Sequence, residues 1–279
     1  MMLVERKICW RVTRYCNLHC SHCLAGHGNA LRADLDGSDR EIALRVIVDS
    51  GVTRITWTGG EPTLCPDLPS LLSESHAHGI ASVVTTHGLA LRKNLLDSLD
   101  RQLDRIRISF DGLEATHNSI RGADVFAKAL RAVVSAHADG YLVEANISVL
   151  DRNVGEIPEL IQTLCAAGVS KIVLLNLLRR ESAIDNMIDR PSIDSHLAML
   201  HRVTVLQSEF PKVVIQQNDY WNVDDRYVVL ESDGEIVLCS EVHDDMSFGS
   251  IIGPLGPHNL TMALKAQTLA HRTPLEPDR

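Results

Sequence analysis

The sequence lacks any long hydrophobic run. None of its apolar stretches approaches the roughly 18 residues that a membrane-spanning helix needs. Its first residues, Met1–Lys7, also lack the apolar stretch of a signal peptide. We therefore expect a cytoplasmic protein that has no membrane partner.

An excess of positive charge is missing as well. The chain carries 27 lysines and arginines against 36 acidic residues, a formal net charge of −9, and shows no basic run. A nucleic-acid-binding surface would show a basic patch or stripe. The dinucleotide fingerprint G-x-G-x-x-G is also absent, because Leu31 stands where a third glycine should follow Gly26 and Gly28. We expect neither nucleic-acid binding nor a Rossmann domain.

Cysteine is present seven times, with three of the cysteines gathered on one short loop. Such a distribution favours metal ligation and reduced core thiols over a disulfide framework. The three are Cys16, Cys20 and Cys23, in a C-x3-C-x2-C pattern that can hold a single metal centre. Three thiolates are one fewer than a cubane iron–sulfur cluster normally takes. A cluster held in this way keeps one iron open to a small ligand with an amine and a carboxylate.

The same loop also permits a zinc site. His19, His22 and His27 lie close to the three cysteines in sequence, and one of them could complete a tetrahedral Cys3His site. The loop by itself leaves both interpretations open.

Short β-rich runs alternate with helical stretches up to about residue 210. Six successive β–α units require a parallel sheet with right-handed crossovers, so the fold class is α/β. The predicted strands are Lys7–Val12, Arg54–Thr58, Ala81–Thr85, Ile106–Phe110, Val143–Val149 and Lys171–Leu177. The predicted helices are a first one from the capping box Ser38-x-x-Glu41 to Gly51, then Leu68–His78, Leu91–Leu103, Val125–Ala138, Glu156–Ala166 and Ile193–Glu209, with Gly79, Gly140 and Gly168 as helix stops.

Past residue 215 the pattern changes. Two strands, Tyr227–Glu231 and Glu235–Cys239, flank Ser232-Asp233-Gly234, a hairpin signature built on Asp-Gly. A short amphipathic helix is predicted near Thr261–Ala270. We therefore expect two domains, residues 1–215 and a small extension, residues 216–279.

The unusual local sequences all fall where predicted strands end. The cysteine loop follows the first strand and Gly59-Gly60-Glu61-Pro62 the second; Thr85-Thr86-His87-Gly88 follows the third, and Ser109-Phe110-Asp111-Gly112 ends the fourth. In a β/α barrel the chemistry gathers at this carboxyl end of the strands, so one rim would collect all four. A zinc knuckle gives no reason for the last three segments, which favours the iron–sulfur cluster.

Together these segments, over about residues 7–210, resemble the radical S-adenosylmethionine (radical SAM) superfamily. The resemblance implies a partial (β/α)6 barrel, one [4Fe–4S] cluster on Cys16, Cys20 and Cys23, and S-adenosyl-L-methionine as cofactor. It also implies the cofactor contacts. The cofactor-binding residues would be Gly59, Gly60, Glu61 and Pro62 of a GGEP motif at the methionyl amine, His22 at the adenine, Ser109 and Asp111 of an S-x-D-G motif, and Arg121 at the carboxylate. The alternative for Arg121 is a surface salt bridge. Asn146 and Asn176, on the fifth and sixth strands, could face the same pocket or be hydrogen-bonded core amides.

The C-terminal hairpin is similar to the SPASM and twitch subgroup, with one departure. That subgroup places a cysteine, a glycine and a second cysteine after the hairpin. Here Cys239 and Gly249 fit the first two positions, but Pro254 stands at the third and no cysteine follows Cys239. We therefore expect a truncated extension without an auxiliary cluster.

The resemblance further implies an enzyme that cleaves S-adenosylmethionine reductively to a 5′-deoxyadenosyl radical. We expect hydrogen abstraction from a small polar substrate of sugar, aminocyclitol or nucleoside type, followed by epimerisation, dehydrogenation or elimination. An electron donor such as flavodoxin or ferredoxin would be a partner. The alternatives are a peptide-modifying enzyme with a separate recognition protein and a non-catalytic zinc or iron–sulfur scaffold.

Cys239 is a candidate catalytic residue. Because no auxiliary cluster claims its thiol, it could give a hydrogen atom to a substrate radical and so invert a stereocentre. The alternative is a buried core thiol, since free cysteines are among the most buried residue types.

Overall fold

The computed structural model describes residues 6–23, 33–176, 189, 191–217, 226–239 and 245–270. Ten strands form a single sheet in this part of the chain. The strands are β1 Lys7–Thr13, β2 Arg54–Gly59, β3 Ala81–Thr86, β4 Arg105–Phe110, β5 Leu142–Val149, β6 Lys171–Asn176, β7 Val214–Gln217, β8 Tyr227–Leu230, β9 Glu235–Cys239 and β10 Met246–Ser250. The helices are α1 Gly37–Asp49, α2 Leu68–Ala77, α3 Lys93–Asp97, α4 Glu114–Arg121, α5 Phe126–Ala138, α6 Ile157–Ala166, α7 Ile193–Glu209 and α8 Gly256–Ala270, with one 3-10 turn at Pro62–Leu64.

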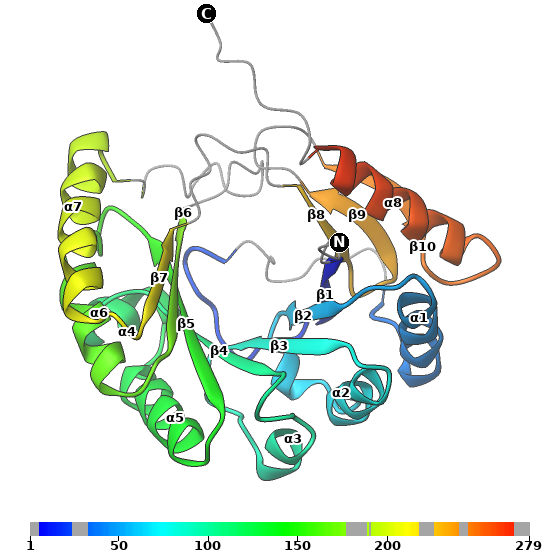
Figure 1. Cartoon of the computed structure of the whole chain (residues 1–279), viewed down its shortest axis with the longest axis horizontal. Coiled ribbons are helices and arrows are strands. Elements are labelled where there is room, and N and C mark those ends of the chain that lie inside the picture. Colours follow the sequence, from blue (N-terminus) through cyan, green and yellow to red (C-terminus); the bar gives the residue numbers. More distant parts are fainter. Residues whose placement is uncertain are drawn as a thin grey trace, which may run out of the picture.

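The sheet has the strand order β10-β9-β8-β1-β2-β3-β4-β5-β6-β7. Strands β1 to β7 pair in parallel, and β8 also joins β1 in parallel, whereas β9 and β10 are antiparallel to their neighbours. The sheet curves into an incomplete barrel with helices on its outer side (Figure 1). The predicted α/β class and partial barrel are therefore confirmed.

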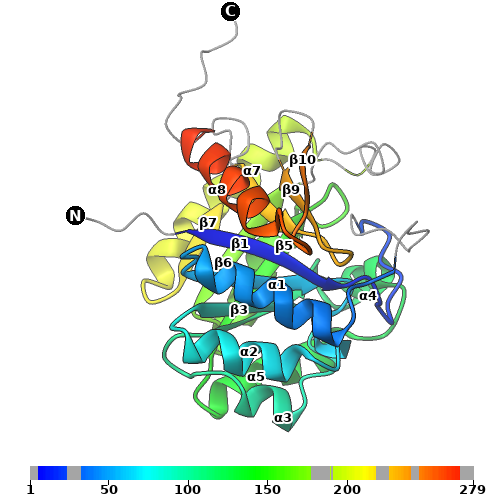
Figure 2. The same ribbon diagram turned by 90° about the vertical axis from the view of Figure 1, so that its right-hand side faces the viewer.

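The C-terminal hairpin extends the barrel sheet. It lies beside β1, and α8 packs against β9, β10 and α1 (Figure 2). The predicted boundary between residues 215 and 216 falls inside β7, a seventh parallel strand that the sequence analysis missed. β7 was missed because its four residues, Val-Ile-Gln-Gln, are too few to show a strand period.

Helices α2, α5, α6 and α7 begin and end within one residue of the prediction, whereas α3 is only the five residues Lys93–Asp97 of the predicted helix Leu91–Leu103. The cap of α1 is Asp36, whose side chain accepts the Asp39 amide, so the predicted cap at Ser38 is wrong. The Ser38 hydroxyl instead donates to the Asp36 carboxylate, 2.7 Å away. Helix α4 was not predicted, because its eight residues carry few apolar side chains. Among the described residues, no helix is long and apolar enough to cross a membrane.

The two faces of the strands differ in polarity. Outward-facing residues such as Trp10 and Trp57 are fully buried under the helices and stack on each other, with ring centroids 5.1 Å apart. Inward-facing residues form a polar layer across the barrel, since Arg107 pairs in register with Glu144 and Glu144 with Lys171. The Arg107 and Glu144 side chains form an ion pair of 2.6 Å. The barrel interior is therefore polar and charged at this level.

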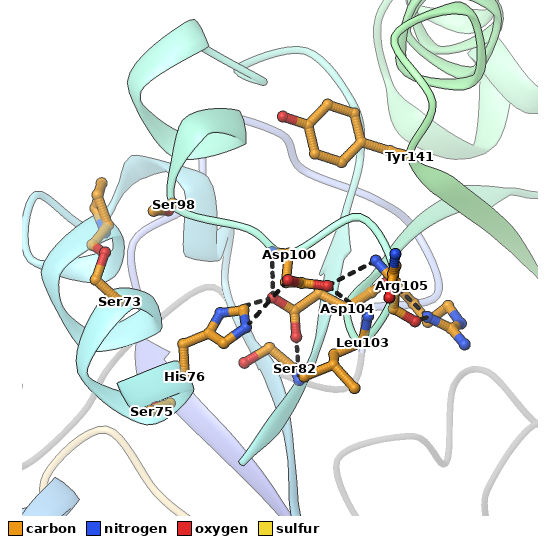
Figure 3. Close-up of polar contacts among 12 residues, drawn as sticks. Ser73, Ser75, His76, Ser82, Ser98, Asp100, Leu103, Asp104, Arg105 and Tyr141 are labelled. Carbon is orange, nitrogen blue, oxygen red and sulfur yellow. Dashed lines mark hydrogen bonds and ion pairs between the residues drawn. The ribbon is translucent and has the colours of Figure 1, made fainter. Parts of the chain in front are cut away.

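A second cluster of polar side chains lies at the amino end of β3 and β4 (Figure 3). Asp104 accepts the backbone amides of Ser82, at 2.7 Å, and of Asp100, at 2.8 Å. His76 of α2 lies 3.6 Å from Asp104 and 3.7 Å from Asp100. Burial raises the pKa of Asp104, although the two amides act in the opposite direction. This group, here called the amino-end cluster, joins α2 and the segment before β4 to the start of β3.

Candidate active site

The cysteine loop leaves the carboxyl end of β1 and is fastened to α4. The Ser21 amide donates to the Ile120 carbonyl, 2.9 Å away, and the Cys23 amide donates to the Cys20 carbonyl, at 3.2 Å. Cys16, Cys20 and Cys23 are all free and partly exposed. The loop therefore presents three thiols on a backbone that the barrel holds in place.

The three thiols share one neighbourhood. Burial raises the pKa of the Cys16 and Cys20 thiols, and the nearby Cys23 raises both further. In the described part of the chain, no three His, Cys, Asp or Glu side chains converge on a point that could hold a single metal ion. His27, one of the histidines of the zinc alternative, lies outside the described residues. Ligation would deprotonate these thiols, because the thiolate is the metal ligand.

The GGEP segment packs directly against the cysteine loop. The Gly60 amide donates to the Thr13 carbonyl at 2.7 Å, and the Glu61 amide donates to the Tyr15 carbonyl at 2.8 Å. A Cβ atom on Gly59 would collide with the Thr13 carbonyl, and one on Gly60 with the Tyr15 carbonyl. Gly59 also has a φ of +138°, which side chains rarely tolerate. The two glycines are thus required by the contact between the two loops, a reason that the sequence did not reveal.

Glu61 is at the centre of a buried network. Its side chain accepts hydrogen bonds from the Thr63 amide at 3.1 Å, the Thr86 hydroxyl at 2.6 Å and the His87 amide at 2.9 Å. The residue is only 1% exposed. The carboxylate therefore fixes the end of β3 to the GGEP segment, whatever it also binds.

His87 extends this network to the cysteine loop. Its Nδ1 accepts the Leu89 amide at 3.1 Å, so Nε2 carries the proton and donates to Asn17 Oδ1 at 2.8 Å. Burial lowers the pKa of His87, against the effect of Glu61, and so favours this neutral form. No role of His87 was predicted from the sequence, and Asn17 carries no sequence signal of its own.

Asp111 and Arg121 form a buried ion pair beside the cysteines. Arg121 Nη2 lies 2.6 Å from Asp111 Oδ2, and Arg121 Nη1 donates to Cys20 Sγ at 3.7 Å. His22 Nε2 is 3.6 Å from the other oxygen of Asp111. Burial opposes ionisation of Asp111, but the Arg121 charge, with smaller contributions from neighbouring groups, holds its pKa below the ordinary value. Asp111 is therefore an anion held between the S-x-D-G strand and the cysteine loop.

Two further residues hold the Asp111 backbone. His117 Nδ1 accepts the Asp111 amide at 3.1 Å, and Asn153 Nδ2 donates to the Asp111 carbonyl at 2.9 Å. Burial and the Arg121 charge lower the pKa of His117 to about 4, so the ring is neutral. Asn153 is fully buried and was missed by the sequence analysis, because it lies in a loop 42 residues after Asp111.

Ser109 and Asn146 lie side by side on the inner face of the barrel. They pair in register between β4 and β5. Asn146 Oδ1 is buried and has no hydrogen-bond partner among the described residues. The side chain of Asn176 lies outside the described residues. Ser109 and Asn146 therefore place polar groups in the barrel interior, one inward-facing position before Asp111.

Cys239 lies at the other end of the barrel. Ile8 pairs with Val228, and Val228 pairs with Leu238, so Cys239 stands beyond the level of Ile8 at the amino end of β1. At about 3.3 Å per residue, this level is roughly 20 Å from the start of the cysteine loop. Cys239 is also 1% exposed. The register thus gives no support to hydrogen donation by Cys239 and favours the core-thiol alternative.

Comparison with known proteins gives a consistent result. The sequence profile of the radical SAM superfamily matches residues 10–164. The chain is 27% identical over 174 residues to Fe-coproporphyrin III synthase of Methanosarcina barkeri, covering 61% of this chain and 44% of that protein. It is 31% identical over 163 residues to mycofactocin maturase MftC of Mycobacterium ulcerans, covering 56% and 44%. The chain thus spans less than half the length of these two relatives.

The fold is similar to that of solved structures as well. The structure of anSMEcpe with bound AdoMet superposes with a TM-score of 0.75 at 16% identity, covering 98% of this chain and 84% of that one. Streptococcus suis SuiB bound to S-adenosylmethionine superposes with a TM-score of 0.72 at 16% identity, covering 83% and 59%. At this identity the similarity concerns the fold alone.

Proposed function

Since the chain belongs to the radical SAM superfamily, we propose that it abstracts a hydrogen atom from a small polar substrate of sugar, aminocyclitol or nucleoside type. The cofactors of the family are a [4Fe–4S] cluster and S-adenosylmethionine. When bound, they supply a 5′-deoxyadenosyl radical through one-electron reductive cleavage of a carbon–sulfur bond. The substrate would then undergo epimerisation, dehydrogenation or elimination.

The residues at the rim fit these cofactors. Cys16, Cys20 and Cys23 supply three thiolates and so would leave one iron of a cubane open. Arg121 Nε and His22 Nδ1 are buried and have no hydrogen-bond partner among the described residues. Buried polar groups are normally paired, so both orphaned atoms favour a bound polar ligand at this place. Arg121 Nε would hold the cofactor carboxylate, and His22 would meet the adenine.

The other predicted contacts remain part of the proposal. Gly59, Gly60, Glu61 and Pro62 would surround the methionyl amine, with Glu61 supplying negative charge. Ser109 would meet the sugar or the carboxylate of the cofactor, while Asp111 would orient Arg121 through their ion pair. These residues bind and orient, and the surrounding barrel keeps water from the reacting atoms.

One observation supports the proposal above the others. Four segments that are far apart in sequence meet at the carboxyl ends of β1 to β4, and they bring the thiols, the Glu61 network and the Asp111–Arg121 pair to a single rim. A zinc knuckle would require only the first of these. The polar layer of the barrel interior, with its Arg107–Glu144 ion pair, supports a polar substrate in place of an apolar one.

The first test is anaerobic reconstitution of the chain with iron and sulfide. We expect about four of each per chain and formation of 5′-deoxyadenosine when dithionite and S-adenosylmethionine are added. Stoichiometric zinc without iron uptake would contradict the proposal and support the non-catalytic scaffold. An electron donor of the flavodoxin or ferredoxin type should replace dithionite.

A second test concerns the substrate. A solved structure of the same fold holds SuiB with a precursor peptide, so peptide modification is the second candidate. Deuterated sugars, aminocyclitols and nucleosides should be screened against peptides for transfer of deuterium into 5′-deoxyadenosine. Transfer from a peptide and from none of the small molecules would overturn the small-substrate proposal.

A further inference from the structure

Arg121 is placed to act on the cluster itself as well as on the cofactor. Its three nitrogen atoms point to three different groups: Nη2 to Asp111, Nη1 to Cys20 Sγ, and Nε to a buried position without a partner among the described residues. Binding of a cofactor carboxylate would explain only the position of Nε. The hydrogen bond to the Cys20 sulfur requires a separate explanation.

The geometry points to Arg121 and Asp111 as a charge pair that sets the reduction potential of the cluster held by Cys16, Cys20 and Cys23. This inference rests on the proposed function, because it requires the cluster. Arg121 donates a hydrogen bond to a ligand sulfur, and hydrogen bonds to the sulfurs are one of the means by which proteins tune iron–sulfur potentials. Asp111 supplies the opposing charge.

The physical reason is the charge of the reduced state. Reduction adds one electron from the external donor to the cluster, and nearby positive charge stabilises that added negative charge. The Arg121 guanidinium therefore makes the potential less negative, whereas the Asp111 carboxylate makes it more negative. Because Asp111 and Arg121 are 1% and 8% exposed, water screens these charges little.

The pair is held in a fixed position relative to the cysteine loop. The Ser21 amide donates to the Ile120 carbonyl, at 2.9 Å, directly beside Arg121 in sequence. Ile120 is fully buried and packs with Leu150. The Asp111 backbone is held on both sides by His117 and Asn153. A group fixed in this way exerts a constant field on Cys20, as tuning of a potential requires.

The barrel offers a matched control. Arg107 and Glu144 also form an arginine–carboxylate pair of 2.6 Å, partly buried and with the same separation as between Arg121 and Asp111. Arg107 lies four residues before Asp111 on β4, about 13 Å along the strand. A change of charge there should shift the potential of the cluster much less, because the Coulomb interaction weakens with distance.

The experiment measures the midpoint potential of the reconstituted cluster without S-adenosylmethionine, by redox titration with dithionite followed by electron paramagnetic resonance. We expect a more negative potential in Arg121→Gln and a less negative potential in Asp111→Asn. The double variant should lie between the two single variants, and Arg107→Gln and Glu144→Gln should shift the potential much less than the changes at Arg121 and Asp111. Arg121→Lys, which keeps the charge but not the fork of donors, should shift less than Arg121→Gln and serves where the latter loses its cluster.

Several results would overturn the inference. If Arg121→Gln keeps the wild-type potential, Arg121 serves the cofactor carboxylate only. The same follows if the single variants Arg121→Lys and Asp111→Asn both keep it. Shifts of the same sign in Arg121→Gln and Asp111→Asn would show a structural disturbance in place of charge tuning. Failure of the wild-type chain to take up iron would instead reject the proposed function, so the two failures are distinguishable.

Discussion

Asp104 at the amino end of the barrel and Asp111 at the carboxyl end are both buried, and each has a histidine within 4 Å, yet their pKa values shift in opposite directions. Burial raises the pKa of Asp104. Its partners, two neutral amides and His76, lower the pKa by too little to reverse that shift. At Asp111 burial is again the largest single effect, but the fixed charge of Arg121, the two neighbouring histidines and a hydrogen bond from Ser148 together outweigh it and lower the pKa. A permanent cation stabilises a buried carboxylate where neutral dipoles do not suffice.

The two clusters also differ in what they connect. The amino-end cluster joins α2, the start of β3 and the segment before β4, and none of these contacts involves a described residue of the rim. The Asp111–Arg121 pair contacts Cys20 and His22, both on the cysteine loop. The comparison predicts that changes at the amino end affect stability, whereas changes at the carboxyl end affect cofactors and chemistry.

The largest effect is expected at the cysteine loop. Cys20→Ala should remove the cluster and abolish formation of 5′-deoxyadenosine. The cubane has only three protein thiolates to begin with, and the two that remain cannot hold it. Iron and sulfide analysis of the reconstituted protein measures the first loss, and chromatography of the reaction measures the second. Cys165→Ala, in α6, is the matched control and should keep both. Full iron content in Cys20→Ala would remove Cys20 from the cluster.

At the amino end, Asp104→Ala should lower the free energy of unfolding by about 2–4 kcal/mol, since two buried amides would lose their acceptor. Urea unfolding measures this change. Asp104→Asn keeps one carbonyl acceptor and should lose less. Affinity for S-adenosylmethionine, measured at equal concentrations of folded protein, should be unchanged in both variants. A loss of affinity without a loss of stability would show that the amino end also affects cofactor binding, contrary to this comparison.

Glu61→Gln should have the converse effect and weaken S-adenosylmethionine binding about ten- to a hundredfold, since a hydrogen bond to a charged group contributes about 1.5–3 kcal/mol. Glutamine keeps an acceptor for Thr63 and Thr86 at the Oε1 position but turns an NH2 group toward the His87 amide, so a smaller loss of stability should accompany the loss of affinity. Isothermal calorimetry of the reconstituted protein measures the affinity. Unchanged affinity would show that Glu61 only holds the end of β3 to the GGEP segment and does not contact the cofactor.

The smallest effect is expected for Cys239→Ala. The thiol lies on the amino-end side of the barrel, so the variant should give the normal product and lose only about 1 kcal/mol of stability. The experiment uses the true substrate in deuterated solvent. Inverted product that carries one solvent deuterium in the wild type and vanishes in the variant, while 5′-deoxyadenosine still forms, would instead establish Cys239 as the hydrogen donor.

Much of the fold could be predicted because its signals are local. The six predicted barrel strands and the hairpin at Asp233-Gly234 are confirmed within a few residues, since strand composition and turn chemistry are properties of adjacent residues. Gly51, Gly79, Gly140 and Gly168 follow helices with positive φ, as predicted. Strands β7 and β10 and helix α4 were missed, because short elements depend on tertiary contacts for their stability.

By itself the sequence determined the family and the residues with distinctive spacing: the three cysteines, the GGEP segment and the S-x-D-G segment. Tertiary structure alone decided which polar groups meet. It joined His87 to Asn17 over 70 residues, Arg121 to Cys20 over 101 and Asn153 to Asp111 over 42. It also placed Cys239 away from the rim, through the register of an antiparallel strand. Spacing along a chain records local geometry, whereas contacts between distant residues arise only when the strands pair and the barrel curves.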